Sequence, residues 1–470
     1  MARVLFIQNF WFEYLGTMIL SAVLKNAGHT VDLVIDSDAE QITRYARNFK
    51  PDLAAMYCVS GSHAWVTRTL KSLKDSIHLR TIVGGPHATY FPEIIQDEGV
   101  DIVCRGEGEG AFSELVERID HGQSFDDIRN LWVKTDTRIT RNPIRPLIED
   151  LDALPFPDRD LYYKYDILKT SPSKHFITGR GCPFNCTFCC NKAYKEIYHG
   201  LGAMVRRTDP ARVCEEIRSV AERYPLESVR FDDEVFLLDP EWAVEFLNRY
   251  AKEIHLPFSC LIRADLTTET IVRAMKEAGC YIAYFGIESG NDRIRNQVLG
   301  KNISRDQIRQ TAWFLRKHGI RIGTFNMVGM PGETFDNAWE TVRLNQEIRS
   351  DYPWCSIIQP YPGTELERQA KSGGFLDPGY GVDDLTQSYF NNTVLDNPDA
   401  QAIVALQKLF YLAVKFPSLS GILRKMARSG RYHGLHRWIF NITYAYRYSK
   451  TYRMPFTELV KRALLWKANY

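Results

Sequence analysis

The sequence predicts an α/β protein with an N-terminal doubly wound parallel sheet, a partial (βα)6 barrel of the TIM type and a helical C-terminal region. Short apolar runs alternate with segments of helical period over residues 1–125 and again over residues 173–365, a pattern typical of parallel sheets covered by helices. No further strand-like run follows in residues 366–470. Because 470 residues exceed the size of one ordinary core, we expect several domains.

The first domain is expected to span residues 1–125, with a parallel sheet covered by helices on both faces. Its five predicted strands are Val4–Ile7, Val31–Ile35, Leu53–Cys58, Thr81–Val83 and Ile102–Cys104. Residues 126–172 contain a predicted hairpin of Leu131–Lys134 and Arg138–Arg141, followed by a proline-rich stretch. Proline density without a regular period suggests a connector between domains.

Loops that follow the predicted strands of the first domain are rich in glycine and polar residues. Ligands of such sheets bind beyond the carboxyl ends of the strands, and glycine lets a backbone approach a large ligand closely. We therefore expect a ligand site at this rim, with ordinary turn glycines as the alternative. The loops are Gln8 to Glu13, Ser60-Gly61-Ser62-His63, Gly84-Gly85-Pro86-His87-Ala88 and Arg105-Gly106-Glu107-Gly108-Glu109.

Residues 173–365 are expected to form an open, partial barrel, because six strands are fewer than the eight of a closed one. The strands are Phe176–Thr178, Ser228–Phe231, Phe258–Ile262, Ile282–Ile287, Ile322–Val328 and Ser356–Gln359. Residues 366–470 are then the helical C-terminal domain.

A cysteine cluster follows the first barrel strand with the spacing C-x3-C-x2-C, at Cys182, Cys186 and Cys189. Three such thiolates can bind three irons of a 4Fe–4S cluster and leave the fourth iron open. A zinc site usually needs two separated pairs of ligands, and a ferredoxin-type cluster needs a fourth cysteine at its own spacing. The adjacent Cys190 is a poor ligand to the same cluster on geometric grounds. Four buried, inert cysteines are the remaining alternative.

This loop resembles the signature of the radical S-adenosylmethionine (SAM) superfamily, with an aromatic residue, Phe188, before the last cysteine. Further similarities point to the cobalamin-binding class of that superfamily, which includes the anaerobic bacteriochlorophyll cyclase, hopanoid methylases and several C-methyltransferases. They lie in Val83–His87, Arg105–Glu109, Arg230–Phe236, Gly286–Gly290, Val328–Thr334 and Tyr361–Thr364.

The resemblance implies a cofactor set of 4Fe–4S cluster, SAM and cobalamin, and roles for particular residues. Phe188 would lie near the SAM adenine, Asp232 or Asp233 would meet its amino group, Arg263 its carboxylate and Glu288 its ribose. As alternatives, Asp232 and Glu288 could be helix caps and Arg263 a surface ion pair. A Rossmann- or flavodoxin-like domain in residues 1–125 would bind cobalamin. The residues implied in that site are Ser60, Gly61, Ser62, Gly84, Gly85, Pro86, His87, Gly106, Glu107, Gly108 and Glu109.

One motif of methionine synthase-type cobalamin domains, Asp-x-His-x-x-Gly, is absent from the loop after the first strand, which reads Gln8 to Gly16. The resemblance therefore implies that this loop supplies no histidine to cobalt. His63 and His87 lie in the rim loops, and we expect hydrogen-bonding roles for both.

The expected activity is methylation of an unactivated carbon in a small-molecule or lipid-like substrate through a 5′-deoxyadenosyl radical and methylcobalamin. A reductase such as flavodoxin or ferredoxin would supply electrons. Oxidative cyclisation or rearrangement is the first alternative. A methylthiotransferase would need three more cluster cysteines in the N-terminal domain, where only Cys58 and Cys104 are found. A non-enzymatic iron–sulfur electron carrier is the alternative of another class.

The composition says more about where the protein resides than about what it binds. The net charge of +2 argues neither for nor against nucleic acid, and we do not expect nucleic acid as a partner. An N-terminus that reads as a strand, and the lack of an apolar run of about 18 residues, favour a cytoplasmic protein. Residues 416–470 contain eleven Lys and Arg against one acid, Glu458, with interleaved aromatic residues. This pattern suits a peripheral contact at the inner membrane surface, RNA or a helical cap on the barrel.

Overall fold

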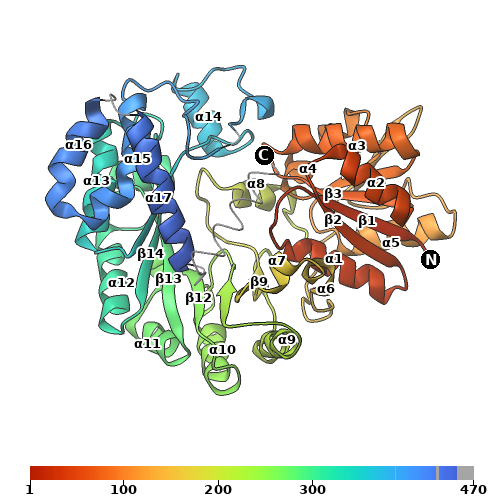
Figure 1. The fold of residues 1–470 in the computed structure, drawn as a ribbon, viewed down its shortest axis with the longest axis horizontal. Helices are drawn as coiled ribbons and strands as arrows, with labels where there is room; N and C mark the ends of the chain where they lie inside the picture. The colour runs from red at the N-terminus through yellow and green to blue at the C-terminus, as the bar shows by residue number, and fades with distance from the viewer. Residues whose placement is uncertain (387, 430–432, 452–470) are drawn as a thin grey trace. The chain divides into compact units, whose positions relative to one another are not determined.

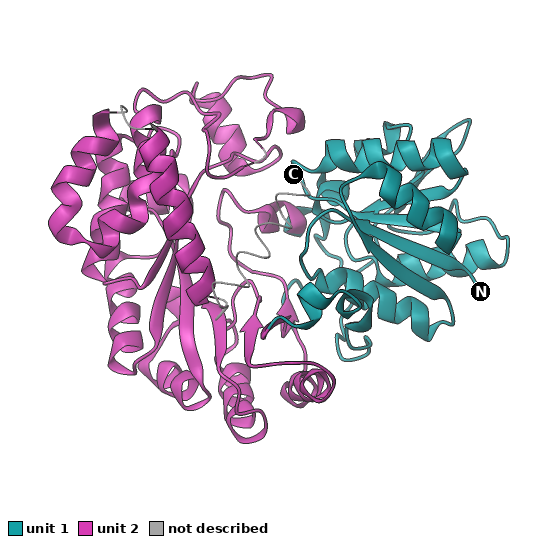
Figure 2. Ribbon diagram, viewed as in Figure 1, with its two compact units in different colours: residues 1–171, 195–206, 460–470 teal, residues 172–194, 207–459 magenta. Residues whose placement is uncertain are grey.

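The computed structural model describes residues 1–386, 388–429 and 433–451. The chain divides into two compact units (Figure 2). Unit 1 contains residues 1–171 and 195–206, and unit 2 contains residues 172–194 and the described residues from 207 onward. Residues 195–206 therefore fold with the first third of the sequence rather than with their neighbours in the chain.

Unit 1 is built on a seven-stranded sheet with the strand order β2-β1-β3-β4-β5-β6-β7 (Figure 1). The first five strands pair in parallel. They are β1 (Arg3–Gln8), β2 (Thr30–Ile35), β3 (Leu53–Tyr57), β4 (Arg80–Gly84) and β5 (Ile102–Cys104). All five predicted strands are confirmed, and their bounds differ from the expected ones by at most one residue at either end.

Helices cover both faces of this sheet, as the unbroken apolar runs of its strands require. On one face α2 (Ala39–Phe49) and α3 (His63–Ile77) lie side by side, and on the other α1 (Leu15–Asn26) and α5 (Glu109–Asp120) do (Figure 1). Successive side chains of β1 point to opposite faces of the sheet. Leu5 packs in the core with α2 and α3, whereas the Phe6 ring centre lies 5.8 Å from that of Phe112 in α5.

The predicted hairpin forms, but it belongs to the sheet rather than to a connector. Strand β6 (Leu131–Lys134) pairs antiparallel with β5, and β7 (Ile139–Arg141) pairs with β6. The expected domain boundary at residue 125 differs from this arrangement, because the sheet runs on through the hairpin. Residues 143–171, with the short helices α6 (Asp160–Tyr163) and α7 (Asp166–Lys169), also fold within unit 1.

Unit 2 contains a six-stranded sheet with the order β15-β14-β13-β12-β11-β8, parallel in every pair. Its strands are β8 (Ser173–Phe176), β11 (Ser228–Phe231), β12 (Phe258–Ile262), β13 (Cys280–Glu288), β14 (Arg321–Val328) and β15 (Tyr352–Ile357). The helices between them are α9 (Pro210–Arg223), α10 (Pro240–Glu253), α11 (Glu269–Glu277), α12 (Arg305–Lys317) and α13 (Phe335–Glu347). The predicted partial barrel is confirmed.

The first and last barrel strands begin earlier in the sequence than expected. Strand β8 ends at Phe176, because the N–H of Thr178 donates to the Asp233 carboxylate instead of continuing the ladder. Strand β15 includes Pro353, which a sheet tolerates at an edge strand such as this one. Both shifts leave the order of the barrel unchanged.

Alternation of side chains along the strands separates the two faces of the barrel sheet. Phe231 packs against Phe246 and Tyr250 of α10, so it faces the helices. Arg230, the preceding residue, faces inward, and its guanidinium lies 5.9 Å from the ring of Tyr284. Tyr284 in turn stacks with Phe325 at 5.6 Å. Tyr284 and Phe325 therefore form an aromatic pair on the inner face.

The C-terminal region is helical, and no strand follows residue 365 in its described part. Its helices are α14 (Glu365–Ser372), α15 (Ala400–Lys415), α16 (Ser420–Ser429) and α17 (His433–Thr451). One face of α17 packs on the barrel, where Tyr444 meets Trp354 edge-on at 5.4 Å and Arg447 donates to the Pro353 carbonyl at 2.8 Å. This contact agrees with the expectation of a helical cap. Arg431, Tyr432 and residues 452–470 of the predicted tail lie outside the described residues.

None of the helices described in residues 1–451 is both long and apolar enough to cross a bilayer.

Candidate active site

The three cysteines predicted to bind a cluster lie on one loop of unit 2, between β9 (Gly179–Arg180) and α8 (Cys190–Ile197). Cys186 is buried, and Cys182 and Cys189 are partly exposed. Burial raises the pKa of the Cys182 thiol, and the nearby Cys189 and Cys186 raise it further. The loop thus brings the three thiols within electrostatic reach of one another.

These thiols fit an iron–sulfur cluster better than a single metal ion. Among the described residues, no three His, Cys, Asp or Glu side chains converge as the ligands of one ion. A 4Fe–4S cluster takes one cysteine at each of its irons, so its ligands stand at separate corners. Three thiols near one another but not convergent match that donor set. Cys190 is exposed at the start of α8, and its hydrogen bond to Cys189 raises the pKa of the Cys189 thiol.

Backbone contacts from a distant segment hold the cysteine loop in place. Thr187 donates its N–H to the Leu299 carbonyl at 3.0 Å and its hydroxyl to the Val298 carbonyl at 2.7 Å. These carbonyls belong to the end of a π-helix, Ile294–Val298, and the turn after it. Phe188 is half-buried in the apolar cluster that includes Ile294, Leu299 and Met330. Such π-helical turns are frequent at functional sites.

Arg263 lies at the end of β12 and faces the cysteine loop. Its guanidinium lies 3.5 Å from the centre of the Phe184 ring, and it donates to the Lys301 carbonyl at 2.6 Å. Burial raises the pKa of the Cys186 thiol, whereas Lys301 and Arg263 lower it by their positive charges. Arg263 is therefore a buried cation beside the cysteine loop, and it is ion-paired with Asp265 at 2.9 Å.

Glu288, at the end of β13, is held in an unusual backbone conformation. Its φ of 61° lies in the left-handed region, where non-glycine residues cluster at functional sites. Its carboxylate accepts from the Lys301 ammonium at 2.5 Å, and both side chains are buried. Gly286 makes room for this pair, because a Cβ there would lie 2.0 Å from the Glu288 Oε1 and 2.4 Å from the Lys301 Nζ. Lys301 was not among the predicted site residues, and no motif in the sequence marks it.

The two adjacent aspartates at the end of β11 have different roles. Asp232 accepts from Arg230 at 2.7 Å and pairs with the His175 imidazole at 2.5 Å. Burial alone would raise the pKa of Asp232, but His175 and Arg230 hold it well below its usual value. Asp233 is buried, and it accepts from the Thr178 backbone and hydroxyl and from Arg207.

Burial raises the pKa of Asp233 to about 6 despite those donors. Its carboxylate fixes the backbone just before the cysteine loop, so Asp233 holds the loop and has no oxygen directed to a ligand. The next residue, Glu234, is exposed and lies close enough to Cys182 and Cys189 to raise the pKa of both thiols. Glu234 was missed in the sequence, although it stands directly beside the predicted pair.

Glu333 is a buried carboxyl in the loop after β14. One oxygen accepts from the N–H groups of Gly329 and Met330 at 2.6 and 3.1 Å. The other, Oε1, has no hydrogen-bond partner among the described residues. Burial raises the pKa of Glu333 to about 7. This carboxyl shapes the loop of the Val328–Thr334 motif.

The predicted cobalamin residues lie together at the carboxyl edge of the sheet in unit 1. Ser60, Gly61 and Ser62 follow β3, and Gly84, Gly85, Pro86 and His87 end β4 or follow it. Gly106, Glu107, Gly108 and Glu109 follow β5. Because Tyr57 is paired with Gly84, and Val83 with Val103, the three loops are neighbours.

Several of these residues have structural partners of their own. The Ser60 hydroxyl lies 3.1 Å from the His87 Nδ1, and His87 stacks on His63 at 4.7 Å, which agrees with the hydrogen-bonding roles expected for these histidines. Glu107 forms a two-bond ion pair with Arg206 at 2.8 and 3.0 Å. A Cβ on Gly85 would lie 2.9 Å from the Cys58 carbonyl oxygen, so backbone packing requires that glycine.

The exposed surface of the rim suits a large, flat and partly apolar ligand. Apart from the first residue, Met1, the exposed large apolar side chains of unit 1 in the described residues are Phe12, Tyr57 and Val59, at 42%, 37% and 36% exposure. All three follow or end strands at this edge, and Gly61 has no atom within 4 Å of where a Cβ would stand. The donor and surface chemistry of the rim therefore fits a corrin ring.

Comparison with known proteins identifies the families of the two parts of the chain that contain these residues. The family model of the radical SAM superfamily matches residues 176–344, and that of the B12-binding domain matches residues 11–116. An uncharacterised methyltransferase of Pyrococcus horikoshii is 30% identical over 398 residues, which are 81% of this chain and 82% of the relative. Cytidylyl-2-hydroxyethylphosphonate methyltransferase of Streptomyces wedmorensis is 26% identical over 77% of this chain and 79% of its own.

Among solved structures, the cobalamin-dependent SAM radical enzyme OxsB, with aqua-cobalamin and SAM bound, shares the fold. Its TM-score is 0.71 at 14% identity, and the match covers 100% of this chain and 80% of that one.

Proposed function

Because the chain belongs to the cobalamin-dependent radical SAM methyltransferases, we propose that it methylates an unactivated carbon of a small, apolar molecule. In this family SAM and the cluster supply a 5′-deoxyadenosyl radical, and cobalamin supplies the methyl group, so the hard chemistry belongs to the cofactors. The observation that supports the proposal most is the convergence of Arg263, Glu288 and Lys301 on the loop of the three cysteines.

Different residues around the cysteine loop would bind different groups of SAM. Arg263, a buried cation, would bind its carboxylate, for which a guanidinium is well suited. Glu234 is the better candidate for the amino group, because Asp232 and Asp233 already have strong partners. Glu288, oriented by Lys301, would accept from the ribose hydroxyls. Phe188 would contact the adenine.

An aromatic inner face supports an apolar substrate. Tyr284 and Phe325 stack there, and Leu261 and Trp354 pack in the same cluster. Leu261 and Phe325 are only partly buried, so a ring or an isoprenoid chain would meet apolar side chains there. We also propose that a reductase such as flavodoxin or ferredoxin delivers the electrons, and that the substrate reaches the enzyme at a membrane surface.

The function is tested by anaerobic turnover of the reconstituted enzyme with methyl-labelled SAM and a lipid extract of the source cells. Label in an extracted small molecule, together with 5′-deoxyadenosine, is the expected result. 5′-Deoxyadenosine with no label transfer would instead favour cyclisation or rearrangement. Absence of both would contradict an enzymatic role and leave an electron carrier.

Two adjacent cysteines provide the matched control for the cluster. We expect Cys189→Ala to abolish SAM cleavage, whereas Cys190→Ala keeps about four irons per chain, because three thiolates suffice for a cluster with one open iron. Loss of the cluster in the Cys190 variant, beside an intact Cys189 variant, would overturn the assignment.

A further inference from the structure

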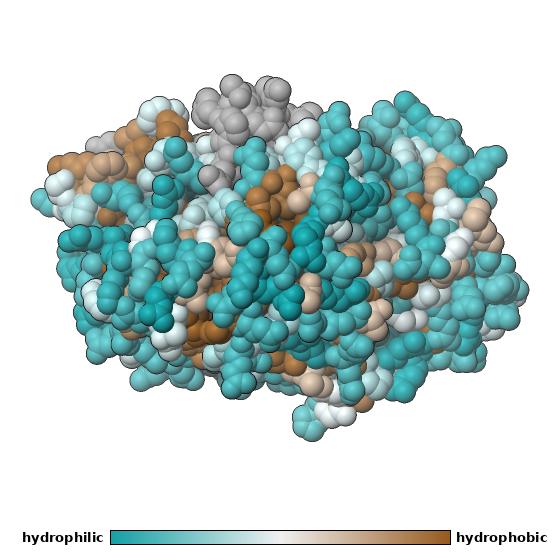
Figure 3. Space-filling model, turned by 90° about the horizontal axis from the view of Figure 1, so that it is seen from below, coloured by the Kyte–Doolittle hydropathy of each residue, from teal (hydrophilic) through white to brown (hydrophobic). Residues whose placement is uncertain are grey.

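Helices α16 and α17, with the short segment that precedes α16, expose an unusual amount of apolar surface. Half of the exposed large apolar side chains in the described residues fall between residues 416 and 446. We call this set the tail face, and it consists of Phe416, Leu419, Ile422, Leu435, Trp438, Ile442 and Tyr446. Apolar residues gather at the upper left of Figure 3, at the end of unit 2 that carries these helices. Contiguous exposed apolar patches mark interaction sites.

The helical period of α17 shows that its exposed apolar residues form one stripe. Leu435, Trp438, Ile442 and Tyr446 are spaced by three, four and four residues, so they lie on one side of the helix. The opposite side, with Phe440, Thr443 and Arg447, is buried. Helix α17 thus packs on unit 2 through one side and exposes an apolar stripe on the other, and such a stripe favours a second, apolar neighbour.

The charge of the segment indicates what that neighbour is. Residues 416–451 contain seven Lys and Arg and no Asp or Glu. Lys425, Arg437 and Lys450 are exposed, and no hydrogen bond or ion pair engages them among the described residues. Lys450 and Arg437 flank the stripe of α17. An apolar stripe that holds Trp and Tyr and is bordered by cations fits the interface of an anionic bilayer.

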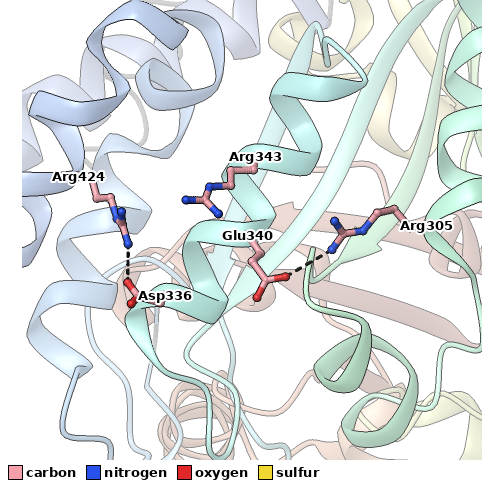
Figure 4. Close-up of a pocket in the computed structure, with 5 residues that line it drawn as sticks. All are labelled: Arg305, Asp336, Glu340, Arg343 and Arg424. Carbon is pink, nitrogen blue, oxygen red and sulfur yellow. Dashed lines mark hydrogen bonds and ion pairs between the residues drawn. The ribbon is translucent and has the colours of Figure 1, made fainter.

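Two other cations of α16 are already paired. Arg424 binds Asp336 at 2.7 Å, and Arg428 lies 3.7 Å from the same carboxylate. Figure 4 shows Arg424 and Asp336 in a pocket of about 320 Å3 that Arg305, Glu340 and Arg343 complete. Reversing the charge of Arg424 or Arg428 would break this network, so neither residue is suitable for testing a free surface charge.

We propose that the tail face docks on an anionic lipid bilayer, with Trp438 and Tyr446 at the level of the headgroups and Lys425, Arg437 and Lys450 on the lipid phosphates. Each cation near such a surface contributes on the order of 1 kcal/mol. Only the purpose of this docking, access to an apolar substrate, rests on the proposed function.

Co-sedimentation of the full-length holoenzyme with vesicles tests the docking. Vesicles of phosphatidylcholine mixed with phosphatidylglycerol should bind the enzyme, and binding should fall with added salt. The double variant Lys425→Glu with Arg437→Glu should weaken this binding by about tenfold or more, and Trp438→Ala with Ile442→Ala should weaken it as well. Trp313→Ala is the matched control, because Trp313 is also an exposed tryptophan on a helix of unit 2.

Equal sedimentation with neutral and anionic vesicles, or none with either, would overturn the proposal. A dimer in light scattering that the Trp438 variant converts to a monomer would assign the tail face to a second copy of the chain instead. Anaerobic SAM cleavage, measured without vesicles, should be unchanged in all these variants. Loss of docking alone therefore leaves the methylation proposal standing, and failure of methylation leaves the docking result standing.

Discussion

Gly286 shows how a single residue can organise the candidate SAM site. Its missing side chain leaves the space in which Glu288, with its left-handed backbone, meets Lys301. The pair then stands beside the cysteine loop with Arg263. Any side chain at this position would displace the ends of Glu288 and Lys301, so even a methyl group would rearrange the pair.

We expect Gly286→Ala to weaken SAM binding by about tenfold or more while leaving the cluster in place. The added methyl group would overlap the Glu288 carboxylate and displace it, and each 1.4 kcal/mol lost is a factor of ten in affinity. Isothermal titration with SAM and the iron content measure the two effects. Gly421→Ala, at an exposed position with no atom within 4 Å, is the control. Unchanged SAM affinity in the Gly286 variant would contradict the assigned role of Glu288.

The buried carboxyl of Glu333 should make stability depend on pH. Its pKa in the folded state is about 7, against 4.5 in the unfolded chain. The folded protein therefore binds the proton more tightly, and this contribution to stability is present below pH 4.5 and is lost as the pH rises through about 7.

Glu333→Gln, which carries no charge at any pH, should be more stable relative to the wild type at pH 8 than at pH 5. The difference between the two pH values is on the order of 3 kcal/mol in the free energy of unfolding. Denaturant unfolding at both pH values measures it. A wild type and variant that respond identically to pH would show that Glu333 is not the buried acid.

Residue roles were predictable where one motif contains the chemistry. The spacing of Cys182, Cys186 and Cys189 predicted one loop for the cluster, and the structure places the three cysteines on one loop, because ligand spacing is a local property. The role of Asp233 could not be read in this way, since its partner Thr178 lies 55 residues away in the sequence. Lys301 meets Glu288 only through the turn after the π-helix, and no sequence period predicts that approach.

At the scale of elements, the glycines at the carboxyl edge of the sheet in unit 1 differ in how closely their neighbours pack against them. Gly85 has φ +95° and is packed against Tyr57 and Cys58, and Gly106 is packed against Tyr198. Gly84 is different, because its Cβ would meet only Cys104 at 3.9 Å. Bulk at Gly85 would therefore damage the fold, whereas bulk at Gly84 tests the ligand surface alone.

We expect Gly84→Val to reduce cobalamin retention strongly and to leave the thermal stability and the cluster spectrum close to those of the wild type. The new side chain would enter the space above the rim that the corrin needs. The cobalamin absorbance of the purified, reconstituted protein measures retention. Full retention would place the corrin away from β4, and a large drop in melting temperature would show that Gly84 is structural.

The strands of both sheets followed from their apolar runs, because burial on both faces leaves a continuous signal in the sequence. The sequence did not predict that the hairpin joins the sheet of unit 1. The residues of an antiparallel pair at the edge of a parallel sheet do not indicate which sheet the pair joins. Periodicity did predict helices beyond residue 365. It did not show that α17 contacts the barrel through Tyr444 and Arg447 and exposes apolar residues on its other side.

At the scale of the whole molecule, the two units are not consecutive pieces of sequence. Residues 195–206 belong to unit 1, where Tyr198 accepts from the Glu107 N–H at 2.9 Å and Arg206 pairs with the Glu107 carboxylate. The side chains of Arg206 and Glu107 are only 5% and 9% exposed. Removing one partner would leave an uncompensated buried charge.

Arg206→Met should therefore destabilise unit 1 by about 3–5 kcal/mol, as is typical when a buried pair is broken from one side. Limited proteolysis should show faster cleavage within residues 1–171. Arg309→Met is the control, because Arg309 forms an exposed pair with Glu347 of the kind that contributes little. Equal resistance of the two variants would show that residues 195–206 are dispensable to unit 1.

The return of residues 195–206 to unit 1 limits how such an enzyme can be recombined. Within residues 1–451 the chain passes between the units at residues 171–172, 194–195 and 206–207. A hybrid joined at a single junction would take residues 1–171 from one parent. It would take residues 195–206, with Tyr198 and Arg206, from the other parent. The two units therefore cannot be exchanged at a single junction. An exchange that preserves both folds must transfer residues 195–206 together with residues 1–171.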